Sequence, residues 1–242
     1  VMMAMVMIGG VSGVSWGQTT YTWNQTGSAQ WTLSTNWTPN RTTPAADDIL
    51  VFNNGATTTA NSIPIQTIGK LLVSGNTNVT LQAASGNVLA IAGGTGTDLD
   101  VAAGSALNIS GTANLSISLA TGATGSILGN MTFTGSGAAG ANTLIAADAS
   151  GIVFGSPAVF TAGTGFTGNA FGSGGTNNTV IFGPGTTYIS AAGGNPFGSS
   201  QPNSKVQFQA GSLFKMAQNT SPSMSGRVYA NFEVDFPGFS QS

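Results

Sequence analysis

A short repeated unit with glycine near its centre constrains the fold of this chain more than any other feature. The unit reads apolar-x-apolar-x-x-Gly-Ser/Thr-x-apolar-x-apolar, and LDVAAGSALNI (99–109) and VQFQAGSLFKM (206–216) fit it at every position. VIFGPGTTYIS (180–190) departs from it only at the last apolar position. Alternating apolar and polar residues predict short strands with one buried face, and the glycine predicts a corner between two strands.

Repeated strand pairs of this kind predict a β-solenoid. One short strand can bury only one face, whereas stacked coils pair their backbones and build a continuous apolar core. We therefore expect an all-β fold with inward Leu, Ile, Val and Phe and with outward Ser, Thr and Asn. The segment GFTGNAFGSGGTNN, 165–178, lacks the alternation and is expected to be a loop between coils.

Charged residues are scarce, which supports this fold and excludes several functions. The 242 residues include five Lys or Arg and seven Asp or Glu, whereas about a quarter of a typical domain is charged. So few strong helix formers favour strands, and the scattered basic residues offer no patch for nucleic acid. Without His, a Ser-His-Asp triad is impossible, and without Cys there is no disulfide or thiol chemistry.

Three segments differ in composition. The apolar start, 1–17, resembles the core and cleavage region of a secretory signal, and we expect the sequence to begin inside such a signal. It is too short and too glycine-broken to favour a transmembrane span. Residues 18–66 are Trp-rich and are expected to cap the solenoid, whereas 67–242 are expected to form its coils. We also expect truncation at the C-terminus, because nothing after Phe236 resembles a terminal cap.

A family resemblance rests on the Trp-rich segment and on the coils that follow it. The stretch TYTWNQTGSAQWTLSTNWTPNRTTPAADDILVF, 20–52, resembles the opening of secreted bacterial surface proteins. The Gly-Ser-x-Leu-x-Ile coils resemble autotransporter-associated β-strand repeats and β-helical adhesin passenger regions. The resemblance implies a right-handed parallel β-helix, export and display at the cell surface, and many such proteins have no known enzymatic activity.

Two pairs of carboxylates have the spacing i, i+2: Asp98 with Asp100, and Glu233 with Asp235. On a strand, this spacing places both side chains on one face about 7 Å apart, a separation that inverting glycosidases use. The neighbouring Leu99, Val101, Val234 and Phe236 are instead suited to the core, which predicts that the carboxylates lie on the solvent face. We therefore assign no catalytic residues to them.

The stretch GGTGTDLDV, 93–101, is one residue away from the calcium-binding nonapeptide of parallel β-rolls. The position that needs a large apolar residue is Asp100, and the apolar residues fall on either side of it. A shift of one residue reverses which face of a strand is buried. We predict a glycine corner without bound metal, and no effect of calcium on the melting temperature.

Two further motifs have competing interpretations. GTGFTG, 163–168, satisfies the dinucleotide-binding pattern, but no helix can follow it in NAFGSGG, so we expect no cofactor. Trp23, Trp31 and Trp37 could form a platform for stacking sugars, but we favour their packing over the open end of the solenoid.

The expected function is non-catalytic: a secreted or cell-surface stalk or adhesin. One alternative is a module that binds or cleaves polysaccharide, and another is a subunit of a self-assembling sheath or filament. The expected partners are an extracellular glycan, a host or neighbouring cell surface, or further copies of the chain. Neither nucleic acid nor a stable membrane span in the mature chain is expected.

Overall fold

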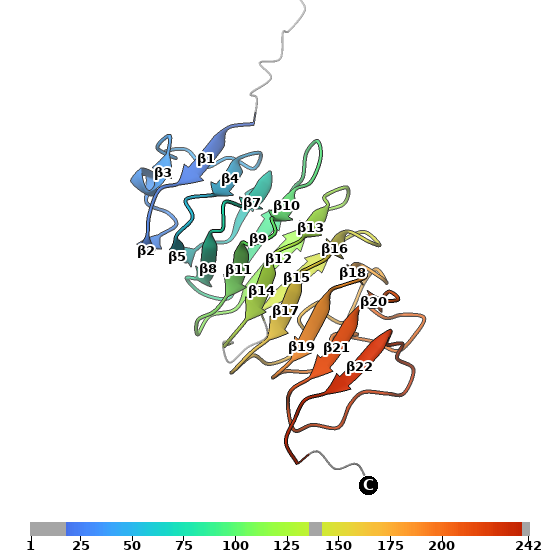
Figure 1. Cartoon of the computed structure of the whole chain (residues 1–242). Helices are drawn as coiled ribbons and strands as arrows, with labels where there is room; N and C mark the ends of the chain where they lie inside the picture. The colour runs from blue at the N-terminus through green and yellow to red at the C-terminus, as the bar shows by residue number, and fades with distance from the viewer. Residues whose placement is uncertain (1–17, 136–141, 239–242) are drawn as a thin grey trace, which may run out of the picture.

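The computed structural model describes residues 18–135 and 142–238, and in this part of the chain the protein is an all-β solenoid. The expected signal segment, 1–17, lies outside the described residues. Strands stack side by side along an elongated body, with β1 near one end and β22 at the other (Figure 1). A single 3-10 turn, η1 (Ser34–Asn36), is the only helical element among the described residues.

The strands form three sheets, which we call A, B and C. Sheet A contains, in spatial order, β3 (Trp37–Thr38), β1 (Thr20–Trp23), β4 (Ile49–Phe52), β7 (Lys70–Val73), β10 (Leu99–Val101), β13 (Gly125–Ile127), β16 (Ile152–Phe154), β18 (Val180–Phe182) and β20 (Val206–Phe208). Sheet B contains β2 (Gly27–Gln30), β5 (Thr57–Ile63), β8 (Asn78–Ala83), β11 (Ala106–Ile109), β14 (Asn130–Phe133), β17 (Val159–Ala162), β19 (Thr187–Ser190), β21 (Leu213–Met216) and β22 (Asn231–Val234). Sheet C contains β6 (Gln66–Ile68), β9 (Asn87–Ile91), β12 (Leu115–Leu119) and β15 (Thr143–Ala146).

Successive coils pair in parallel, as a solenoid requires. Leu71 pairs with Leu99 of the next coil, and Leu99 pairs with Gly125 of the coil after that. The described exception to parallel pairing is β3, which runs antiparallel to β1 at the end of sheet A. The predicted all-β, parallel solenoid is therefore confirmed.

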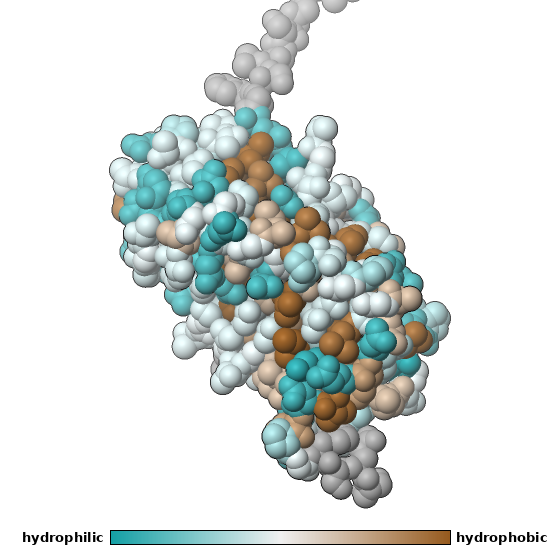
Figure 2. Space-filling model, in the orientation of Figure 1, coloured by the Kyte–Doolittle hydropathy of each residue, from teal (hydrophilic) through white to brown (hydrophobic). Residues whose placement is uncertain are grey.

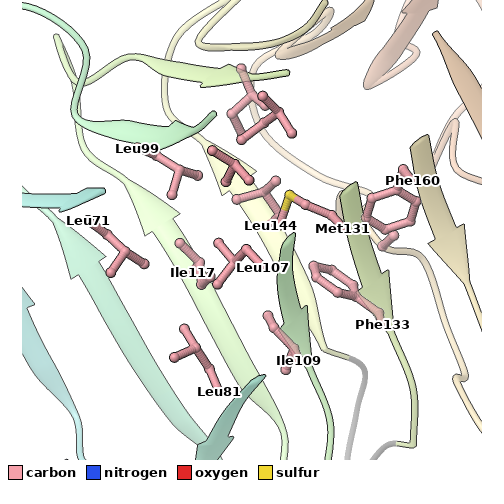
Figure 3. Packing of buried hydrophobic residues seen from close by; sticks show 14 of the residues in the cluster. Leu71, Leu81, Leu99, Leu107, Ile109, Ile117, Met131, Phe133, Leu144 and Phe160 are labelled. Atoms are coloured by element: carbon pink, nitrogen blue, oxygen red, sulfur yellow. The ribbon is translucent and has the colours of Figure 1, made fainter. Parts of the chain in front are cut away.

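The alternation seen in the sequence decides which side chains enter the core. In β11, Leu107 and Ile109 are fully buried while Ala106 and Asn108 are partly exposed. Equivalent inward residues of all three sheets meet in one interior (Figure 3). Those labelled there are Leu71 and Leu99 of sheet A, Leu81, Leu107, Ile109, Met131, Phe133 and Phe160 of sheet B, and Ile117 and Leu144 of sheet C.

The Gly-Ser/Thr pair of the repeat forms the corner between sheets A and B. Gly104 and Gly211 have φ angles of +81° and +88°, which favour glycine. At the Gly211 corner the residue that follows also closes the turn, because the Ser212 hydroxyl donates to the Gln209 carbonyl at 2.7 Å. The Thr186 hydroxyl makes the same bond to Gly183 at 2.6 Å. The predicted glycine corner is confirmed, and the short hydroxyl side chain completes it.

The third side of the solenoid changes along its length. Sheet C ends at β15, and the segments that follow β17, β19 and β21 form loops in its place. Residues 165–178 contain no strand, as expected from the sequence. These loops nevertheless contribute to the core, because Phe166, Phe171 and Phe197 are at most 2% exposed.

The core becomes aromatic where sheet C ends. Phe154 and Phe182 of adjacent sheet A strands stack with ring centroids 4.4 Å apart. On sheet B, Tyr188 stacks between Phe160 and Phe214, at 5.3 and 5.2 Å. Larger rings therefore fill the interior where the third wall is irregular.

The N-terminal end of the core is closed by the three tryptophans. Trp23, Trp31 and Trp37 are at most 1% exposed, and their rings pack against one another and against Phe52. Each indole N–H is bonded: Trp23 to Thr58 Oγ1, Trp31 to Gln66 Oε1, and Trp37 to the Trp31 carbonyl, all within 2.9 Å. The alternative of an exposed sugar platform is wrong, because these rings are buried.

The outer surface is weakly polar. Figure 2 shows a mostly pale face with small hydrophilic areas and a broken line of hydrophobic residues along its length. Among the residues that the structure describes, no helix is long and apolar enough to cross a membrane.

Candidate functional site

Buried charges recur along one edge of the solenoid, at the corners where different coils enter their strands of sheet A. Lys70 is the first residue of β7, Asp98 immediately precedes β10, and Lys205 immediately precedes β20. Asp48, which precedes β4, is buried at the same kind of corner. We call this set the charged corner. Burial of a charge is costly unless a partner compensates it, so the partners of each residue matter.

Lys70 and Asp98 compensate each other across adjacent coils. Leu71 N–H donates to the Asp98 carbonyl at 2.8 Å, so the two coils are in register here. Lys70 Nζ lies 3.4 Å from Asp98 Oδ1 and also donates to the carbonyls of Thr95 and Thr97, at 2.5 and 3.1 Å. Asp98 Oδ2 accepts the Thr124 N–H at 2.9 Å. The lysine therefore has two carbonyl acceptors and an ion-pair contact in a buried site, and Asp98 Oδ1 itself accepts no hydrogen bond from the described residues.

Arg41 and Asp48 form a second buried pair beside the tryptophans. Arg41 Nε donates to Asp48 Oδ2 at 2.7 Å, and the Ala45 N–H donates to the same oxygen at 2.9 Å. The guanidinium also lies 5.9 Å from the ring centres of both Tyr21 and Trp37. This pair fixes the loop that carries Arg41 against the end of the core.

Lys205 has no such compensation. It is 3% exposed, and its Nζ donates to the carbonyl of Thr176. Among the described residues, which include every Asp and Glu of the sequence, none places a carboxylate within 4.0 Å of this nitrogen. Burial lowers the pKa of the Lys205 ammonium from its usual value.

The two carboxylate pairs noted in the sequence lie in different surroundings. Asp98 is fully buried, so its expected place on the solvent face is wrong: it lies at a corner before the strand, where the alternation does not apply. Asp100 does point outward and is partly exposed, and burial raises the pKa of its carboxyl. One member of this pair is thus held by Lys70 and the other lies on the opposite side of the sheet.

Glu233 and Asp235 lie on the exposed face, as predicted. Both contact Lys215 Nζ of the adjacent strand, at 3.2 and 2.7 Å. These bonds raise the pKa of the Lys215 ammonium. The cluster is a surface ion pair between β21 and β22, and such pairs stabilise a fold only slightly.

The glycine-rich stretches are loops of the solenoid. Gly93 and Gly96, in the segment before β10, have φ angles of +89° and +84°. Lys70 Nζ reaches this loop, where it contacts the Asp98 carboxylate and the Thr95 carbonyl. In GTGFTG, no helix follows and Phe166 packs into the core.

Two functional features escaped the sequence reasoning. No basic residue lies close to Asp98 along the chain, yet Lys70, one coil of 28 residues earlier, is its partner. The spacing of one coil is the signal in the sequence that points to this pairing, but it differs between coils. Nothing in the local pattern indicated that Lys205 is buried. Within the described residues there is no group of three or more Asp or Glu side chains that could hold a metal ion.

In comparisons with known proteins, no family model, no curated protein and no solved structure matches the chain. Functional inference therefore rests on the geometry of the solenoid itself.

Proposed function

We propose that the chain is a structural stalk or adhesin of a secreted or cell-surface protein. The observation that carries this proposal is the uninterrupted core, which runs from the Trp cluster to Phe232 with parallel backbone pairing between successive coils. In such an array each coil supports only its neighbours, and length is gained without loss of rigidity. A rod of this kind can hold a more specific domain away from a surface.

The distribution of charge supports a non-catalytic role. The two buried carboxylates, Asp48 and Asp98, are each engaged with a cation and a backbone N–H. Asp148, at the coil after β15, accepts the Gly122 N–H at 2.6 Å. General acid–base catalysis needs carboxylates with separated pKa values facing a common substrate, and these three are committed to backbone and lysine or arginine partners.

Binding of a polysaccharide is the second candidate, and one surface hollow favours it. A pocket of about 190 Å³ near the β21 end of the rod is lined by Phe214, Tyr229, Asn195 and Gln218 together with Ser and Thr residues. Aromatic faces with amide and hydroxyl groups suit the apolar and polar faces of a sugar. In an adhesin this pocket would contact a glycan directly.

Mechanical unfolding tests the stalk. A single molecule pulled from both ends of the solenoid should lengthen in steps that each release about one coil, because each coil is held by its neighbours. Abrupt loss of the whole fold in one event would contradict the proposed stalk.

A glycan array tests adhesion, and release of new sugar ends from any bound polysaccharide would overturn the non-catalytic role. Sedimentation at several concentrations tests self-assembly, which a monomeric stalk does not show.

A further inference from the structure

A pocket of about 430 Å³ lies beside Lys205, at the place where sheet C ends. Leu144 N–H still donates to the Ala170 carbonyl at 2.8 Å, so the coil after β15 begins to follow the sheet. The next residues, 172–176, are Gly-Ser-Gly-Gly-Thr and form no strand. They line the pocket together with Ile145 to Ala147 at the end of β15. The hollow thus lies beside β15, where residues 172–176 continue the chain without forming the next strand of sheet C.

The walls of this pocket, which we call the Lys205 pocket, combine three kinds of group. Ile145, Ala146 and Phe171 provide an apolar side. Ser173, Thr176 and Thr179 bring hydroxyl groups. Lys205 provides a cation, and a Cβ atom added to Gly175 of the pocket wall would lie 3.8 Å from Nζ. An apolar wall with a few convergent polar groups is typical of a small-molecule site.

The ammonium of Lys205 is incompletely coordinated. An ammonium has three N–H donors, and the partner that the structure shows for Lys205 is the Thr176 carbonyl. Lys70, at the equivalent corner, has two carbonyls and the Asp98 carboxylate. Asp148 follows the pocket residue Ala147 but lies more than 4.0 Å from Lys205 Nζ, and its Oδ2 accepts the Gly122 N–H of the preceding coil. The carboxylate that completes Lys70 therefore has no counterpart at Lys205.

We propose that the Lys205 pocket binds a small organic monocarboxylate, whose carboxylate takes the place at Lys205 that Asp98 takes at Lys70. A single cation matches a single negative charge, whereas phosphate sites gather several donors or an Arg fork. The apolar wall and the hydroxyl groups suit a hydroxylated carbon skeleton of about the size of a sugar acid. This site goes beyond the proposed stalk, since a rod needs no ligand and would stand if the pocket were empty.

The test is a titration of the full chain with D-glucuronate at constant ionic strength, followed through the ¹³Cε signal of the lysines. Glucuronate should bind, shift the Lys205 signal and raise the pKa of its ammonium, because a carboxylate favours the charged form. D-glucose, which has the same ring without the charge, should bind at least ten-fold more weakly. Inorganic phosphate should not compete better than glucuronate.

Matched variants separate a specific site from general attraction. Lys205→Met should lose at least ten-fold in affinity, whereas Lys215→Met, which removes a surface ammonium, should bind as the native chain does. Lys205→Gln provides a second variant, and circular dichroism shows whether each remains folded. Equal binding by Lys205→Met and the native chain, absence of binding by the native chain, or preference for phosphate would overturn the proposal. None of these results bears on the mechanical test of the stalk.

Discussion

The buried lysines at the two ends of the charged corner differ in their surroundings. Lys70 enters a coil whose third side is a strand of sheet C, and the following coil brings Asp98 directly beside it. Lys205 enters a coil whose third side is a loop, and the neighbouring coil offers the Thr176 carbonyl instead. One site is closed by an ion pair and the other is open to a pocket.

This difference shows what sheet C contributes. Where it is present, as at Lys70 and Asp98, polar groups of adjacent coils are held against one another. Where it is absent, aromatic side chains such as Phe171 and Phe197 maintain the core, and backbone bonds still close the corner at Lys205, but no carboxylate of the described residues lies within 4.0 Å of its ammonium. A regular wall thus favours a structural role for a buried charge, and an irregular wall leaves room for a binding role.

The largest expected effect is the loss of the Asp98 charge. Asp98→Asn keeps the shape and an acceptor for the Thr124 N–H, but it leaves Lys70 buried without a carboxylate. Breaking a buried pair in this way should lower the free energy of unfolding by about 3 kcal/mol, measured by urea denaturation. The matched control is Asp100→Asn, on the outer face of the same strand, which should leave stability unchanged or slightly higher because burial disfavours its charge. Equal losses in both variants would contradict this account.

The next effect tests whether the loop after β17 replaces a strand of sheet C. Phe171 packs against Phe160 with ring centroids 5.0 Å apart and against Phe182 at 6.0 Å. Phe171→Ala should therefore cost about 3 kcal/mol, as for a core aromatic, whereas Ser173→Ala, on the exposed part of the same loop, should not change thermal stability. If Phe171→Ala is equally harmless, the loop does not support the core.

A smaller effect concerns pH. Because burial lowers the pKa of Lys205, the unfolded chain binds more protons between that lowered pKa and the usual value of about 10.4. Stability should rise with pH across this window. Burial also raises the pKa of Tyr188, and that of Tyr229 to about 12, which works in the opposite direction at higher pH. The free energy of unfolding is measured against pH for the native chain and for Lys205→Met. The tyrosine contributions are common to both, so they cancel in the comparison, and the stability of the native chain should rise more steeply with pH. Parallel curves would contradict a depressed pKa.

The smallest effect belongs to the surface cluster on β21 and β22. Asp235→Asn removes one of two carboxylates at Lys215 and leaves Glu233 in place. Exposed ion pairs are screened by solvent and salt, so the melting temperature should stay within experimental error at moderate salt. A clear drop would show that charges at this face matter as much as those at the buried corner.

The sequence predicted the strands and corners because both follow from local rules. Inward residues such as Leu107 and Ile109 alternate with polar ones, and Gly104 needs a left-handed backbone. The charged corner follows no local rule. Its contacts join residues one coil apart, and the coil length is not constant: it is 21 residues between Ile49 and Lys70 but 28 between Leu71 and Leu99.

The alternation of apolar and polar residues also could not predict which aromatic residues of the loops are buried. Phe166, Phe171 and Phe197 lie in segments without strands, in the coils that follow the end of sheet C. The position of Asp98 was misassigned for a related reason: strand alternation was extended by one residue into a corner, where the backbone turns and the side chain is covered by Lys70.

The central claim is that Lys70 has a structural partner and Lys205 does not, and the most direct test is to replace each lysine with methionine and to measure the free energy of unfolding without added carboxylate. Lys70→Met leaves Asp98 buried without its cation, so stability should fall by about 3 kcal/mol. Lys205→Met removes an uncompensated buried charge and keeps a similar volume, so stability should be unchanged or higher. Losses of equal size in the two variants would contradict the account.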